Sequence, residues 1–108
     1  MEQLREEYGA DLEVRDVHVQ LDMDERLAPQ IVSCADSAGL AAREWQTMPI
    51  IIVLPGMAIA AAAMVAELHG RMGYFPCVVK LLSGPDRVFV VGEVLDLADV
   101  RSKARQTR

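Results

Sequence analysis

The sequence is poor in the residues that tie small domains together covalently or through metals. It has 108 residues, with only two cysteines and two histidines. Cys34 and Cys77 lie far apart and form no C-x-x-C pattern, and His18 and His69 are isolated, which argues against a zinc site. Free cysteines are typical of a reducing compartment, so we expect a cytoplasmic protein without a metal or other cofactor.

Positive charge is also scarce. Eleven Lys and Arg stand against sixteen Asp and Glu, which leaves a formal net charge of −5 at pH 7. Proteins that bind duplex DNA or RNA need a basic surface against the phosphates, so polymeric nucleic acid is not an expected partner. The apolar fraction of 52% is enough to bury a core, and no repeat or linker divides the chain. Residues 1–108 are therefore predicted to form one domain.

No apolar run is well suited to cross a membrane. An uncharged and mainly apolar stretch, residues 48–66, approaches the roughly 20 residues that a spanning helix needs. Pro55-Gly56 in its middle would break such a helix, and its second half is mostly alanine. Met1 leads directly into charged residues, so we expect neither a membrane span nor a secretion signal.

The apolar periodicity divides the chain into alternating helices and strands. Residues 50–54 are a β-branched run without alternation, typical of a central parallel strand covered on both faces. The short turn at 83–86 makes the last strand pair antiparallel. This order predicts an α/β domain with a mainly parallel sheet flanked by helices and an antiparallel edge hairpin. The expected elements are helices over 3–8, 27–38, 57–68 and 97–106 and strands over 16–21, 50–54, 76–82 and 88–95.

The alanine-rich helix is apolar on two opposite faces. One face carries the large residues Met57, Met64, Val65 and Leu68. A helix that is apolar all round is normally covered all round, and one sheet can cover only one face. We therefore predict a homodimer in which the small-residue face packs against a second copy. That face consists of Ile59, Ala62, Ala63 and Ala66.

In an open parallel sheet, ligands bind beyond the carboxyl ends of the strands. Pro55, Gly56 and Met57 lie there, where unpaired helix amides suit a phosphate or ribose oxygen. The turn with Ser83, Gly84 and Arg87 shares that edge and is the second candidate. The alternative is that both are plain turns, because the chain has neither a G-x-G-x-x-G nor a Walker sequence.

Three other stretches could carry chemistry, but each has a simpler structural explanation. The acidic residues 22–25 could hold a divalent cation, although capping of the next helix is commoner. Glu67, His69 and Arg71 sit close together at the far end of the alanine-rich helix, where a capped helix end with Tyr74 and Phe75 in the core is expected. Trp45 precedes the central strand on the same far edge and is expected to anchor the core or an interface.

Four stretches of the sequence resemble one protein family. They are EWQTMP at 44–49, LPG at 54–56, AELHGRMGYFP at 66–76 and VGEVLDL at 91–97. Over residues 12–108 the chain is similar to the small CRISPR-associated accessory proteins of type III loci, the Csx family numbered fifteen. The resemblance implies a Rossmann-like domain, related to the CARF sensors, that forms dimers and binds cyclic oligoadenylate, in particular cyclic tetra-adenylate.

The family's members open with a short strand and a polar loop of the Asn-Phe-Ser-His kind, whereas this chain begins at Met1 within the first helix. Either the true start lies upstream, or this version lacks the first strand and has an incomplete site. Among the functions that the resemblance implies, binding of cyclic oligoadenylate without turnover, as a sponge for this messenger, ranks first. A metal-independent ring nuclease ranks second. The acids expected near the carboxyl ends of the strands, Asp22, Asp24 and Asp86, are poor groups for proton transfer at neutral pH. A homodimeric interaction module without a ligand is the third possibility.

Overall fold

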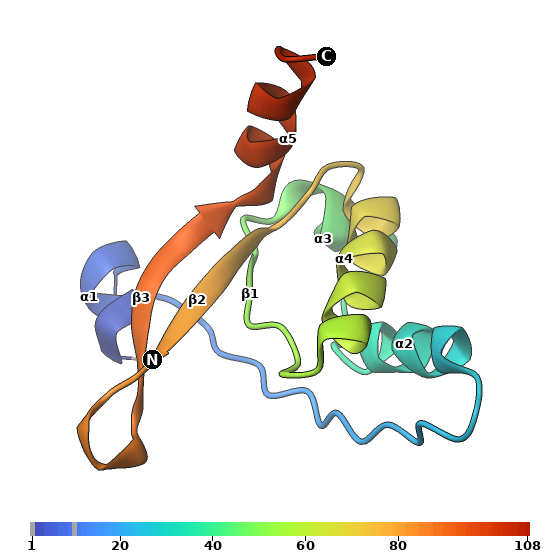
Figure 1. The fold of residues 1–108 in the computed structure, drawn as a ribbon, viewed down its shortest axis with the longest axis horizontal. Helices are drawn as coiled ribbons and strands as arrows, with labels where there is room; N and C mark the ends of the chain where they lie inside the picture. The colour runs from blue at the N-terminus through green and yellow to red at the C-terminus, as the bar shows by residue number, and fades with distance from the viewer. Residues whose placement is uncertain (1, 10) are drawn as a thin grey trace.

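The computed structural model describes residues 2–9 and 11–108, without the side chains of Glu2, Gln3 and Arg87. This part of the chain is a small α/β fold with a three-stranded mixed sheet of order β1-β2-β3 (Figure 1). Its helices are α1 Glu2–Tyr8, α2 Leu27–Asp36, α3 Ala42–Thr47, α4 Ala58–Met72 and α5 Leu97–Arg105, and its strands are β1 Ile51–Ile52, β2 Cys77–Ser83 and β3 Phe89–Asp96.

The sheet differs from the expected one in which strand is central. β1 pairs parallel with β2 only through Ile51 and Ile52, whereas β2 pairs antiparallel with β3 along its whole length. The middle strand is therefore β2, and the 50–54 run supplies a two-residue edge strand. The prediction of a mainly parallel sheet was wrong, because a buried apolar run does not reveal how many partners its backbone finds.

A bulge interrupts the hairpin of β2 and β3. Lys80 lies opposite Glu93 and Leu81 opposite Val91, so Gly92 is the extra residue of β3. A β-carbon at this position would lie 2.8 Å from the side chain of Leu82. Only glycine fits here without displacing a neighbour, which explains its position inside a strand.

The strand expected over 16–21 does not form. Within the described part of the chain, residues 13–21 make no backbone-to-backbone hydrogen bond, and they run as an extended segment toward α2 (Figure 1). Side chains hold the segment instead, since Arg15 Nη1 donates to the Ala38 carbonyl over 2.8 Å. Alternating apolar residues favour an extended backbone but do not provide a neighbouring strand, so the prediction was wrong.

The core lies among α2, α3 and α4. Ile31, Trp45 and Leu68 are 2%, 4% and 2% exposed, and one residue of α4, Ala60, is fully buried. Trp45 thus anchors the core, as predicted, on a helix that the apolar pattern of this short stretch did not indicate. Ile50, Ile52 and Leu54 pack on the cluster from the sheet side.

The remainder of α4 faces outward. Ile59 is 59% exposed, Ala62 and Ala66 are exposed, and Ala63 is half-buried and packs on the core. The helix ends at Gly73, whose φ of 85° places it in the left-handed region that favours glycine. No helix in the described ranges is long and apolar enough to span a bilayer.

Candidate functional site

The first candidate, Pro55 to Met57, joins β1 to α4. Pro55 is half-buried, Gly56 is exposed, and Met57 is the N-cap residue of α4, 44% exposed. The Met57 carbonyl accepts from Ala61 over 2.8 Å, but no side chain caps the first turn of the helix. A β-carbon at Gly56 would meet nothing within 4 Å, so this backbone is open to an approaching group. Open amides at a helix start can hold an anionic oxygen.

The second candidate, the hairpin turn, has a different construction. Ser83 is the exposed last residue of β2, and the Gly84 amide donates to the Val88 carbonyl over 2.6 Å. A β-carbon at Gly84 would lie 2.8 Å from that same carbonyl oxygen. Close backbone packing in the turn therefore explains Gly84. The side chain of Arg87 lies outside the described residues.

The structure does not bring the two candidates together. The last parallel pair joins Ile52 to Val78, and β2 then runs five residues further to Ser83, about 16 Å at 3.3 Å per residue. After β1 the chain turns toward α4, whereas the hairpin tip projects on the side of α1 (Figure 1). One protomer therefore presents the Pro55 to Met57 loop and the hairpin turn as separate surfaces.

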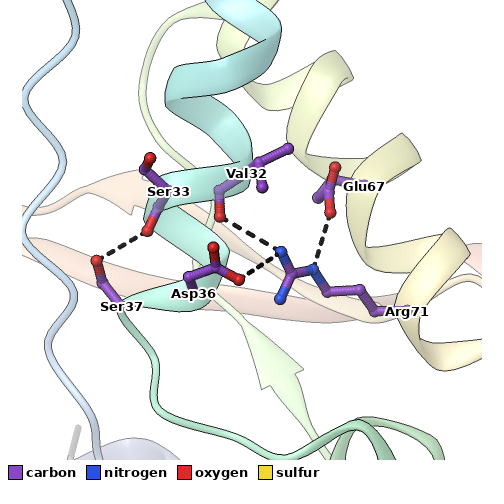
Figure 2. Close-up of polar contacts among 6 residues, drawn as sticks. All are labelled: Val32, Ser33, Asp36, Ser37, Glu67 and Arg71. Carbon is purple, nitrogen blue, oxygen red and sulfur yellow. Dashed lines mark hydrogen bonds and ion pairs between the residues drawn. The ribbon is translucent and has the colours of Figure 1, made fainter.

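The stretch around Arg71 is structural. Arg71 Nε donates to Glu67 Oε2 over 2.8 Å and Nη2 donates to Asp36 Oδ1 over 2.9 Å, with a longer bond of 3.3 Å to the Val32 carbonyl (Figure 2). The guanidinium also lies 5.9 Å from the ring centroid of Trp45. The hydrogen bond to Glu67 is the main reason that the pKa of Arg71 is raised. Arg71 thus joins α4 to α2.

The rest of that stretch closes the helix as expected, with one exception. The Gly73 amide donates to the His69 carbonyl over 2.8 Å, and the His69 ring stacks on Phe75 with centroids 4.1 Å apart. Phe75 is half-buried and does not belong to the core cluster, and Tyr74 is 43% exposed, so the prediction that these two aromatic residues lie in the core was wrong. The left-handed residue at Gly73 redirects the chain and leaves the tyrosine on the surface.

The acidic residues 22–25 form a turn. Asp22 Oδ1 accepts from the Asp24 amide over 2.9 Å, and the Gln30 side chain binds both the amide and the carbonyl of Asp22. The N-cap residue of α2 is Arg26, without a side-chain cap, so an aspartate does not cap this helix. Among the described residues, no group of three or more His, Cys, Asp and Glu is placed to hold a metal ion.

Two open hollows lie elsewhere on the described surface, and the sequence patterns indicated neither. The larger, about 380 Å³, lies between α1 and β3 and is lined by Glu6, Glu7, Val91, Gly92 and Glu93. The smaller, about 240 Å³, lies between the extended segment and α2. Its lining residues are His18, Gln20, Gln30, Ser33, Cys34 and Ser37. Both combine segments distant in sequence, so no local motif could have marked them.

Comparison with known proteins identifies no relative of the chain. No protein family model, no curated protein and no solved structure matches the chain. The function must therefore be argued from its own residues and from the sequence resemblance.

Proposed function

We propose that this protein binds cyclic oligoadenylate, in particular cyclic tetra-adenylate, at the loop between β1 and α4. It would act in the cytoplasm as a sponge that lowers the free messenger of type III CRISPR signalling, on a Rossmann-like, CARF-like domain. The observation that carries the proposal is the exposed, uncapped turn at Gly56 and Met57, in the loop between the parallel strand β1 and α4. The resemblance of residues 12–108 to the Csx family numbered fifteen supplies the ligand class.

The chemistry of the loop suits an anionic ring better than it suits catalysis. Phosphate oxygens accept hydrogen bonds from the polarised first amides of a helix, and this interaction does not require a basic protein. No histidine or carboxylate belongs to the Pro55 to Met57 loop itself. Ring cleavage would need a group that positions or exchanges a proton at the ribose hydroxyl, so binding without turnover is the activity that fits best.

A second protomer would complete the site. The outer face of α4, with Ile59 exposed and Ala62 and Ala66 small, permits close approach of another helix. A two-fold pair doubles every ligand-binding group, which suits a ring of four phosphates. Because the hairpin turn lies apart from the loop within one protomer, Ser83, Gly84 and Arg87 can reach a ligand there only from the partner.

Gly56→Leu tests the location of the site. The substituted side chain has open space and no positive φ to resist it, so the fold should persist while the ligand is blocked. We expect calorimetry with cyclic tetra-adenylate to show tight binding by the wild type and at least a tenfold loss in Gly56→Leu, or about 1.4 kcal/mol. The unfolding midpoint of the variant should remain close to the wild-type value.

Gly70→Leu is the matched control, because Gly70 is also exposed, also has nothing within 4 Å of a β-carbon, and lies at the opposite end of α4. Its affinity should equal that of the wild type. Equal losses in both variants, or none in either, would remove the site from this loop. Chromatography of the ligand after hours of incubation separates the alternatives, since linear products mean a ring nuclease and an absence of binding leaves an interaction module.

A further inference from the structure

The C-terminal helix α5 has no buried residue, although it begins directly at the end of β3. It projects beyond the sheet, away from the hairpin tip and from α1 (Figure 1). Leu95 at its base is 38% exposed and Val100 on the helix is 49% exposed. The helix meets its own protomer only at its start, where Leu97 and Ala98 are half-buried beside β2 and the Leu97 amide donates to the Pro76 carbonyl over 3.3 Å. From residue 99 onward α5 is exposed and forms a separate arm.

The arm concentrates positive charge in a protein whose net charge is −5. Residues 100–108 contain four cations and no acid. Arg101 and Arg105 are four residues apart, so they share one face of α5. Lys103 pairs with Asp99 over 3.0 Å, whereas no ion pair forms between Arg101, Arg105 or Arg108 and any other described residue.

The larger hollow has the opposite character. Glu6 and Glu7 of α1 and Glu93 of β3 line it, together with Val91 and Gly92, and its lining contains no lysine or arginine. Glu93 has only a distant partner, with Lys80 Nζ at 3.5 Å. The hollow is open to solvent, so its carboxylates are accessible to a guanidinium group of another molecule, with which carboxylates form strong charge-assisted hydrogen bonds.

The two charged surfaces cannot meet within one protomer. The carboxylate of Asp96 accepts from the Ala98 and Asp99 amides at the start of α5, which extends beyond the end of β3 and away from α1 (Figure 1). The hollow lies between α1 and β3, and α5 extends from the end of β3 away from α1 (Figure 1). A second copy can present its arm to this hollow, and a two-fold axis would let the first copy do the same in return.

We propose that α5 of one protomer docks through Arg101 and Arg105 into the Glu6, Glu7 and Glu93 hollow of a second copy. The contact is separate from the outer face of α4 and needs no ligand. Complementary charges steer two molecules that otherwise repel each other through their net charge, and they fix the relative orientation. The exposed Val100 supplies apolar area beside the arginines.

Charge reversal on each side gives a decisive experiment. One variant carries Glu6→Lys and Glu7→Lys, and the other carries Arg101→Glu and Arg105→Glu. We expect sedimentation at about 0.05 M salt to show association of the wild type and at least tenfold weaker association of each variant alone. An equimolar mixture of the two variants should associate again, because each hollow then meets an arm of opposite charge.

The controls separate this contact from association through α4. Asp99→Ala and Lys103→Ala, made as two separate variants, each change the net charge of the arm by one and keep both arginines. Association of each variant should persist. Ile59→Lys, added to both charge-reversed variants, should leave the association of their equimolar mixture intact. Association that survives both charge-reversed variants, or a mixture no more associated than its components, would overturn the proposal and leave the cyclic tetra-adenylate site untouched.

Discussion

At the scale of single residues, Arg71 makes the polar link between the two longest helices. Its side chain is 20% exposed and binds a carboxylate on each of α2 and α4. We expect Arg71→Met to lower the free energy of unfolding by about 1–3 kcal/mol, because Glu67 loses a partner in a partly buried position. Urea unfolding followed by circular dichroism measures this loss.

Lys80→Met is the comparison for that measurement, since its ion pair with Glu93 is long at 3.5 Å and more than half exposed. It should change stability by no more than about 0.5 kcal/mol. Arg71→Lys should fall between wild type and Arg71→Met, because one ammonium cannot reproduce the planar fork. Equal stability of the two Arg71 variants and the wild type would show that the link is only geometric.

Cys77 makes the stability of the fold depend on pH under alkaline conditions. Burial, with a smaller contribution from the charge of Asp96, raises the pKa of its thiol above the ordinary value of 9.0. As pH rises, the unfolded chain releases this proton first, so stability is complete below about pH 9 and falls as pH passes through the raised pKa. Unfolding midpoints of wild type and Cys77→Ala between about pH 7 and 10.5 should diverge only above about pH 9.

At the scale of elements, α5 depends on its N-cap residue, Asp96. Asp96 Oδ1 accepts from the amides of Ala98 and Asp99 over 3.0 and 3.3 Å, and beyond the half-buried Leu97 and Ala98 the helix is exposed. Asp96→Ala should therefore cost about 1 kcal/mol of helix stability and fray α5. Hydrogen exchange of the amides of residues 98–105 measures the fraying, and Asp99→Ala, which removes only the exposed pair with Lys103, should have a smaller effect.

This cap was predictable from sequence, because Asp96 precedes an amphipathic run at the spacing that N-caps require. The ends of α1 and α4 at Gly9 and Gly73 were predictable for the same local reason, and both glycines have positive φ. The end of α2 was not, because this helix stops at Asp36 with Ser37 as its C-cap, before the glycine at position 39. Strand partners were not predictable. The partner of Ile51 is Cys77, 26 residues later, and no local pattern carries that pairing.

The candidate site, too, was predictable only in part. The loop at Gly56 follows from Pro and Gly between a strand and a helix, and it lies where it was expected. The hairpin turn was expected at the same edge, but β2 is much longer than β1, so the turn projects past it. Strand lengths depend on tertiary packing, which is why the spatial relation of the two surfaces needed the structure.

At the scale of the whole molecule, the buried core is off-centre. Ile31, Trp45, Met64 and Leu68 cluster among three helices, while β2 from Lys80 onward and all of α5 have no buried residue. In high salt, where charged contacts between copies are screened, we expect amide exchange to be slowest in residues 60–72 and much faster in α5. Uniform protection across both regions would contradict this arrangement.

The extended segment before α2 has a consequence for how this chain can vary. Side-chain bonds at Arg15 and Gln30 pin its two ends, and between them the backbone belongs to no ladder. Residues inserted or deleted near His18 would shift no strand register and open no hydrogen-bonded pair. We expect length changes to accumulate here among natural variants, and a protein engineer could place a reporter peptide in the same position.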